Sequence, residues 1–296
     1  MYLEFILSIF GSALLLNIFK YFYKFNVVTL NAIVVNYIIA TSLSFIIQGE
    51  PISISKAASE PWIGIAFALG VLFILLFNLM AYCSDKLGVA STSIANKITF
   101  IFPTFLWIIF YGEPISIIKI SGLIIAILAI FLTGEKSKGS SFKGNILLLL
   151  SLFIGGGLLD TLLSYAQQEL VPKEQTSIFF GYLFLFAFIV GFILMLFQKA
   201  KGLPWPSKKD ILWGIILGVP NYFSMYLFLK SLDKIPTSTA FPVANMGVIL
   251  GSTLLSVILF KEQLSKRKLI ALFFAITAII LISFHKQIES LIFSSL

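Results

Sequence analysis

The hexapeptide YGEPIS at residues 111–116 has a counterpart in FKEQLS at residues 260–265. The two stretches lie 149 positions apart, close to half of the 296-residue chain. A second pair, SDKL at 84–87 and LDKI at 232–235, lies 148 positions apart. Polar residues that match at a constant offset are better evidence of duplication than apolar residues, because apolar residues match easily by chance in a chain that is rich in them. The sequence therefore predicts an internal repeat of about half its length.

The rest of the chain is strongly apolar. Hydrophobic residues make up 59% of it and charged residues 11%, and the mean hydropathy is +1.02. A soluble domain is about half apolar and about a quarter charged, so this composition excludes an ordinary soluble enzyme. One His and one Cys, Cys83, exclude a multi-ligand zinc site, an iron–sulfur cluster and an intrachain disulfide. We expect an all-α polytopic membrane protein with no metal or cofactor.

Ten apolar runs are each close to the length of a membrane span. A spanning helix needs about 20 mostly apolar residues, because the hydrocarbon core is about 30 Å thick. The first run lacks a basic segment before it, so we interpret it as a retained helix and not as a signal peptide. The runs cover roughly residues 2–19, 30–47, 62–83, 89–110, 115–133, 144–165, 176–197, 210–231, 237–260 and 266–284.

The net charge of +8 is distributed along the gaps between the runs. Nucleic-acid binders cluster their basic residues on one face or in a tail, so this distribution argues against a nucleic-acid partner. The odd-numbered gaps hold 14 of the 21 Lys and Arg residues, and the even-numbered gaps with the tail hold 6. The positive-inside rule then predicts that the odd gaps are cytoplasmic and both termini lie outside.

The repeat divides the runs into two groups of five. We predict two five-helix transmembrane repeats, residues 1–140 and 141–296, arranged around a central cavity. Since five is odd, the second copy enters the membrane from the opposite side, which makes the repeat inverted. In such folds the substrate site usually lies near the bilayer midplane between the repeats, and alternating access comes from rocking one against the other.

Ten helices arranged as five plus five resemble the drug/metabolite transporter superfamily, in its EamA-type branch. The resemblance includes the turns at Gly112-Glu113 and Lys261-Glu262, each followed by a run rich in small residues. It implies a secondary transporter, since members of the superfamily often export amino acids, metabolites or drugs. In the second turn Lys261 replaces the glycine, so we do not expect a left-handed glycine to be required there.

Two charged residues, Lys97 and Asp160, lie well inside apolar runs and are not counted with any gap. Lys97 lies about a third of the way into the fourth run, where a lysine costs about 2.5–3.5 kcal/mol on insertion scales. We expect it to face a cavity, a substrate anion or a carboxylate, and the alternative is snorkelling to the interface. Asp160, after Gly155–Gly157 in the sixth run, could pair with Lys97 or carry a proton that couples transport. The alternative for Asp160 is an interfacial position near the end of its helix.

Further polar residues are candidates for the cavity wall. Asn96 and Asn245 lie at the same repeat position, so a shared structural role is as plausible as contact with substrate. Asn221 and Tyr222 follow Pro220, which removes a backbone hydrogen bond at depth in the eighth run. We expect substrate-binding positions at Lys97, Asn96, Asn245, Asp160, Asn221 and Tyr222.

The two symmetric glutamates, Glu113 and Glu262, stand just before the fifth and tenth runs. A carboxylate at a helix N-terminus can accept hydrogen bonds from free N–H groups and complements the positive end of the helix. Their symmetry favours a structural role, and we predict that both are helix caps.

We therefore expect a secondary transporter, an exporter or exchanger of a small polar or amphipathic metabolite such as an amino acid. A flippase or export component for a lipid-linked substrate is the alternative, and an intramembrane enzyme is not expected, since no His, Cys or paired acidic motif lies at depth. The expected partners are a small-molecule substrate, the lipid bilayer, and a proton or counter-substrate. The protein is expected in the cell (inner) membrane, as a monomer or weak homodimer.

Overall fold

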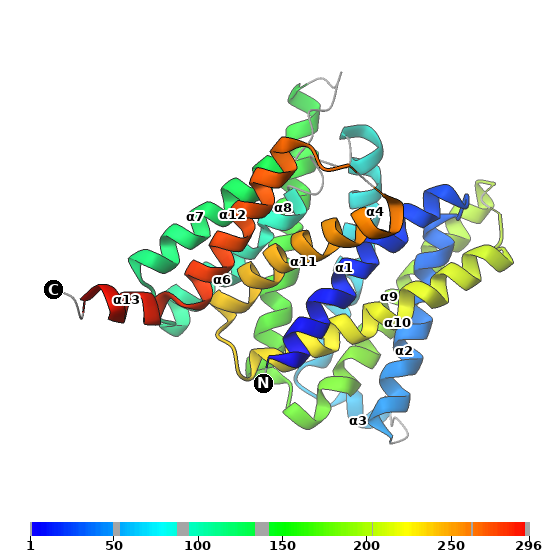
Figure 1. Cartoon of the computed structure of the whole chain (residues 1–296). Coiled ribbons are helices and arrows are strands. Elements are labelled where there is room, and N and C mark those ends of the chain that lie inside the picture. The colour runs from blue at the N-terminus through cyan, green and yellow to red at the C-terminus, as the bar shows by residue number, and fades with distance from the viewer. Residues whose placement is uncertain are drawn as a thin grey trace. The chain divides into compact units, whose positions relative to one another are not determined.

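The computed structural model describes residues 2–49, 54–87, 95–133, 142–202, 204–261 and 263–293. These residues form helices and connecting turns, with no strand among them. Figure 1 shows the order of the helices along the chain. A helix lies in each of the ten predicted apolar runs. The prediction of an all-α polytopic membrane protein is thus confirmed.

The predicted number of ten membrane spans is not confirmed. Among the described residues six helices are long and apolar enough to cross a bilayer. A seventh span arises if α12 (Lys266–Ser283) and the following helix are counted together across a bend of 75°. Three further apolar helices are shorter, at Leu3–Phe19, Ala95–Tyr111 and Ile117–Leu132.

The helices form two compact units, each discontinuous in sequence. Unit 1 comprises residues 1–78 and 162–233, and unit 2 comprises residues 79–161 and 234–296. Each unit therefore combines helices from both predicted five-helix repeats. The predicted repeats describe sequence similarity, whereas the units describe packing, and the two divisions do not coincide.

Unit 1 is held together by close approach of its helices. Its helices are α1 (Leu3–Lys24), α2 (Thr29–Gln48), α3 (Ile54–Ala58), most of α4 (Ile63–Leu87), α9 (Thr176–Ala200) and α10 (Lys208–Leu232), with short turns at Ala166–Leu170 and Lys173–Gln175. Gly214 and Gly218 of α10 lie against α2, where an added Cβ would approach Val35 and Ile39 to 2.5 and 2.8 Å. This GxxxG spacing lets the two backbones pack closely, as it does in other membrane helices.

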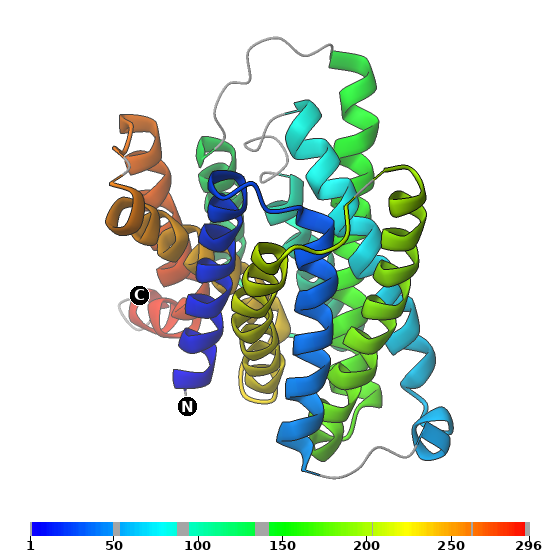
Figure 2. The ribbon, with the colours of Figure 1, turned by 90° about the vertical axis from the view of Figure 1, so that its right-hand side faces the viewer.

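Small residues also allow the helices of unit 2 to pack closely. It contains a 3₁₀ turn at Ile98–Phe100, α6 (Ile101–Tyr111), α7 (Ile117–Thr133), most of α8 (Phe142–Tyr165), α11 (Thr237–Phe260), α12 and α13 (His285–Phe293). The alanines of α12, Ala271, Ala275 and Ala278, are fully buried. Gly122 of α7 lies against Ile282 of α12, where an added Cβ would meet its side chain at 2.7 Å. In Figure 2 the same helices are turned by 90°.

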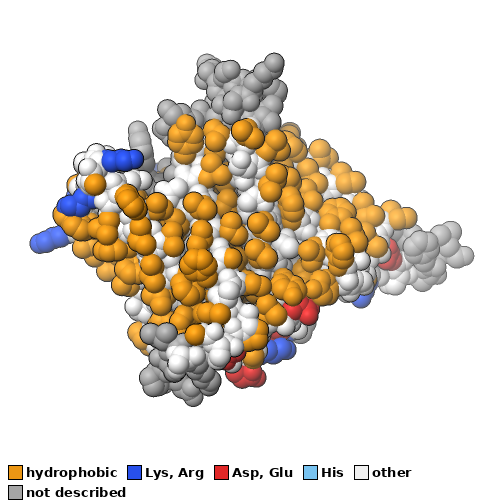
Figure 3. All heavy atoms as spheres, turned by 180° about the vertical axis from the view of Figure 1, so that it is seen from behind, with side chains coloured by type: hydrophobic (Ala, Val, Ile, Leu, Met, Phe, Trp, Pro, Cys, Tyr) orange, Lys and Arg blue, Asp and Glu red, His pale blue; other side chains and the backbone are white. Residues whose placement is uncertain are grey.

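The surface of the described residues is apolar. Many large hydrophobic side chains are exposed along the helices, among them Phe110, Ile117 and Leu147 at 78%, 82% and 70% exposure. Figure 3 shows one face on which hydrophobic side chains predominate. A soluble monomer rarely exposes so much contiguous apolar surface, so lipid contact explains this surface.

Candidate functional site

Asn96 and Lys97 of unit 2 lie where the helix type changes. Residues 95–97 are α-helical, Ile98–Phe100 form a 3₁₀ turn, and α6 begins at Ile101. Pro103 lies in the first turn of α6 and has no N–H to donate to the carbonyl of Thr99. The proline therefore accounts for the change of helix type, and Asn96 and Lys97 lie just before it.

Lys97 pairs with Asn245 of α11. The Lys97 Nζ donates a hydrogen bond to Asn245 Oδ1 at 3.4 Å, and Asn245 Nδ2 donates to the carbonyl of Phe241 at 3.1 Å. Both side chains are partly exposed within the molecule. An ammonium group has three donors, so the long bond to Asn245 leaves Lys97 with capacity for an anionic partner.

Asp160 of α8 binds the residue at the centre of the 3₁₀ turn. Its Oδ2 accepts a hydrogen bond from the Thr99 hydroxyl at 2.7 Å, and the same hydroxyl lies 2.9 Å from the backbone carbonyl of Asn96. Thr99 is 3% exposed. Lys97 and Asp160 also attract each other electrostatically. Unit 2 thus brings together four of the predicted site residues, Asn96, Lys97, Asp160 and Asn245.

The glycine triplet before Asp160 explains how α8 comes so close to this turn. A Cβ at Gly156 would lie 2.7 Å from Thr99 Cγ2, and a Cβ at Gly157 would lie 2.2 Å from the ring of Phe102. Only residues without a side chain fit at these two positions. Sequence reasoning missed Thr99, although the polar segment around Asn96 and this glycine triplet were both visible.

Asn221 and Tyr222, the other two predicted site residues, lie in unit 1. Asn221 Nδ2 donates to Asn36 Oδ1 of α2 at 3.1 Å. The Tyr222 hydroxyl lies 2.9 Å from Ser177 Oγ of α9, and Ser177 Oγ donates to the carbonyl of Ser44 at 2.8 Å. Tyr222 is fully buried. These contacts join α2, α9 and α10, and α10 continues as a helix through Pro220.

Glu113 caps a helix that is distant in sequence. Its Oε1 accepts the N–H of Thr237 at 2.8 Å, and its Oε2 accepts the N–H of Ser238 at 3.0 Å and the Ser238 hydroxyl. Both N–H groups belong to the first turn of α11, so the cap serves α11 and not the helix that follows Glu113. The prediction for Glu262 lies outside the described residues.

A buried lysine completes this cap. Lys119 of α7 is 0% exposed and donates to Ser238 Oγ at 2.5 Å and to the carbonyl of Pro114 at 3.1 Å. Glu113 attracts it electrostatically. The six lysines counted above with the even-numbered gaps and the tail include Lys119, although its place as the third residue of α7 indicates a buried role. The residues Glu113, Lys119 and Ser238 are called the α11 cap below.

Comparison with known proteins agrees with this architecture. Residues 142–284 match the model of the EamA-like transporter family. The chain is 26% identical over 270 residues to a protein of Haemophilus influenzae (strain ATCC 51907 / DSM 11121 / KW20 / Rd) described as "Uncharacterized protein", covering 86% of this chain and 89% of that one. A crystal structure is similar in fold, with a TM-score of 0.75 and 13% identity over 94% of both chains. The family match confirms the resemblance predicted from the repeat and points to a membrane transporter of small molecules rather than an enzyme.

Proposed function

We propose that this chain, whose residues 142–284 belong to the EamA-like transporter family, is a secondary transporter that exports or exchanges a small polar or amphipathic metabolite such as an amino acid. The proposal places it in the cell membrane and assigns it alternating access. The observation that carries it is the cluster of Lys97, Asn245, Thr99 and Asp160 in unit 2, which holds a cation and a carboxylate between apolar helices.

Lys97 is assigned the role of binding an anionic group of the substrate. A charge among apolar helices is costly unless it has a partner, and the bond to Asn245 is long at 3.4 Å. A substrate carboxylate would replace this bond with a stronger, charge-assisted one. Asn245 would then be free to bind the same substrate through its amide oxygen.

Asp160 is assigned one of two roles: it binds and releases the proton that couples transport, or it binds an ammonium group of the substrate. Its hydrogen bond to Thr99 suits both protonation states. When Asp160 is ionised, it accepts the Thr99 hydroxyl proton at 2.7 Å. When Asp160 is protonated, it can donate to Thr99 Oγ1, while Thr99 donates to the Asn96 carbonyl at 2.9 Å. A carboxyl group that keeps its partner in both states can gain and lose a proton without leaving an unpaired polar group.

Alternating access is supported by the predicted inverted repeat and by the position of Pro242 within α11. This helix carries Asn245 and runs unbroken through Pro242. Proline within a helix removes one backbone hydrogen bond, so α11 has a weak point three residues before Asn245. We assign to this point the bending that would expose the cluster to one side of the membrane and then to the other.

The test is amino-acid exchange in proteoliposomes. Vesicles that contain the purified protein are loaded with a mixture of the twenty amino acids, and each labelled amino acid is then supplied outside. We expect saturable exchange of at least one of them, lowered at least tenfold by Lys97→Gln. The matched control is Lys230→Gln, which removes an exposed lysine that pairs with Glu4 at 3.3 Å. No exchange of any amino acid would refute this substrate class, and equal rates for Lys97→Gln and the control would refute the site.

A further inference from the structure

Five lysines gather at one end of unit 1. Lys24 ends α1, Lys199 and Lys201 lie at the end of α9, and Lys208 and Lys209 begin α10. All are exposed except Lys199, which is partly exposed. These five residues are called the basic rim below.

Polar contacts tie the α1–α2 connection and the start of α2 to the α9–α10 connection and the start of α10. The Asn31 side chain at the start of α2 donates to the carbonyl of Pro204 at 3.2 Å. The N–H of Val28 donates to Asp210 Oδ1 at 2.8 Å, which ties the segment after α1 to the first turn of α10. Figures 1 and 2 show the end of α1 and the α9–α10 connection at the same end of these helices.

The rim has little negative charge to offset it. Asp210 is the only acidic residue in the segments 20–28 and 199–213. It is 1% exposed and forms a capping box with Ser207 at the start of α10. Its carboxylate is thus directed into the fold, and the exposed surface of the rim is cationic.

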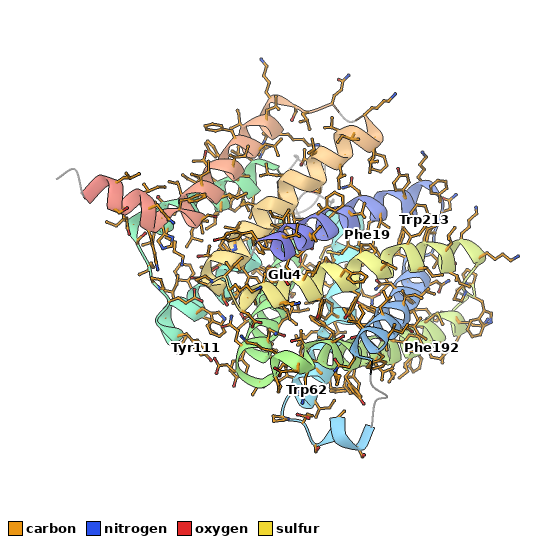
Figure 4. All side chains as sticks on the ribbon, turned by 60° about the horizontal axis from the view of Figure 1, so that its bottom comes forward. Glu4, Phe19, Trp62, Tyr111, Phe192 and Trp213 are labelled. Atoms are coloured by element: carbon orange, nitrogen blue, oxygen red, sulfur yellow. The ribbon has the colours of Figure 1, made fainter. Side chains whose placement is uncertain are left out.

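Aromatic rings lie beside these lysines. The indole of Trp213 stacks on Tyr21 and on Phe25, each at 5.4 Å between ring centroids. Figure 4 labels Trp213 near the end of α1. Trp205 is 54% exposed, and the Lys199 Nζ lies 3.8 Å from its ring centroid. Tyr and Trp concentrate at membrane interfaces, where one side of the ring is apolar and the other is wet.

The apolar surface of α10 begins directly beyond the lysines. Ile211 and Leu212 are 43% and 55% exposed, and they follow Lys208 and Lys209 in the first turns of the helix. α10 is long and apolar enough to cross a bilayer, so this apolar surface lies among the acyl chains and the lysines lie directly outside it. A bilayer meets both, because its phosphates lie next to its acyl chains.

We propose that the basic rim binds the phosphate groups of anionic phospholipids. The lysine ammonium groups of α1, α9 and α10 contact the headgroups, while Trp205 and Trp213 lie at the level of the headgroup boundary. A lysine near an anionic membrane surface contributes on the order of 1 kcal/mol. The rim belongs to two of the odd-numbered gaps, which the charge distribution predicts to be cytoplasmic, and the anionic lipids are concentrated in that leaflet.

The test compares lipids with the full-length protein in detergent micelles. Phosphatidylglycerol and phosphatidylcholine are titrated separately, and binding is followed by the rise in melting temperature and by native mass spectrometry. We expect tighter binding of phosphatidylglycerol, weakened by salt. Lys208→Gln with Lys209→Gln should weaken it about tenfold or more. The matched control, Lys173→Gln with Lys230→Gln, removes a lysine from the 3₁₀ turn before α9 and one from the last turn of α10, at the other end of these helices.

Three results would overturn the proposal. These are equal binding of the two lipids, equal weakening by the control pair, and full competition by millimolar inorganic phosphate, which would indicate a site for the free ion. If the first variant does not fold, Lys24→Gln with Lys201→Gln replaces it and is expected to weaken phosphatidylglycerol binding in the same direction.

Discussion

The α11 cap should respond strongly to the loss of one charge. Glu113→Gln keeps the shape of the side chain but replaces one carboxylate oxygen with an NH₂ group. The carboxylate accepts two backbone N–H groups at 2.8 and 3.0 Å. Hydrogen bonds to a charged group contribute about 1.5–3 kcal/mol, against about 0.5–1.5 kcal/mol for neutral ones. The variant should therefore lose about 2 kcal/mol at α11 alone.

Lys119 adds to this loss. It is 0% exposed, and Glu113 is the carboxylate that attracts it. Breaking a buried ion pair by removing one partner costs about 3–5 kcal/mol. Because Glu113 is partly exposed, water screens the pair, and we expect about 2 kcal/mol instead. In total Glu113→Gln should lower the free energy of unfolding by about 4 kcal/mol.

A double-mutant cycle separates the two contributions. Lys119→Met removes the buried charge, so Glu113→Gln in that background should cost only about 2 kcal/mol. The assay is equilibrium unfolding in mixed micelles with increasing denaturing detergent. Glu174→Gln, at an exposed position of unit 1, is the control and should change stability by less than about 0.5 kcal/mol. A loss below about 1 kcal/mol for Glu113→Gln, or strict additivity in the cycle, would refute this reasoning.

Two further predictions concern α8. Asp160→Asn should abolish the dependence of transport on a proton gradient in proteoliposomes while leaving the protein folded, and unchanged stimulation by the gradient would contradict the coupling role. Gly157→Ala should lower the melting temperature, because its Cβ would lie 2.2 Å from the Phe102 ring, and overpacking of this kind costs about 1–3 kcal/mol. Gly64→Ala, with open space around the added Cβ, is the control, and equal shifts for the two variants would show that α8 does not pack as described.

The helices were predictable because their signal is local. An apolar segment in lipid must pair its backbone N–H and C=O groups with each other, and an α-helix achieves this within one segment. A helix occurs in each of the ten apolar runs. Pro103 likewise carries a local signal, which appears as the 3₁₀ turn at Ile98–Phe100. The number of spans was harder to predict, because hydropathy does not reveal where a helix ends or bends, as α12 does before His285.

The candidate site was predictable only in part. Lys97 and Asp160 stood out because a charge among apolar residues needs a partner. In the structure Lys97 binds Asn245, and Asp160 binds Thr99, two residues after Lys97. Partners supplied by tertiary packing could not be found in this way. Glu113 has the correct chemistry for a cap, but its target, α11, lies 124 residues further along the chain. Thr99 has no signal as a single residue, because a buried threonine is common in any membrane helix.

Lys97 is the residue proposed to bind the carboxylate of the substrate. The most direct measurement compares exchange of a transported amino acid with exchange of its carboxamide, in wild type and in Lys97→Gln. Removing one partner of a buried charge pair costs about 2–5 kcal/mol, so wild type should prefer the free acid by at least about 30-fold. Lys97→Gln should lose most of this preference while still exchanging the amide. An unchanged preference for the free acid in Lys97→Gln would contradict the assignment of Lys97 to the substrate carboxylate.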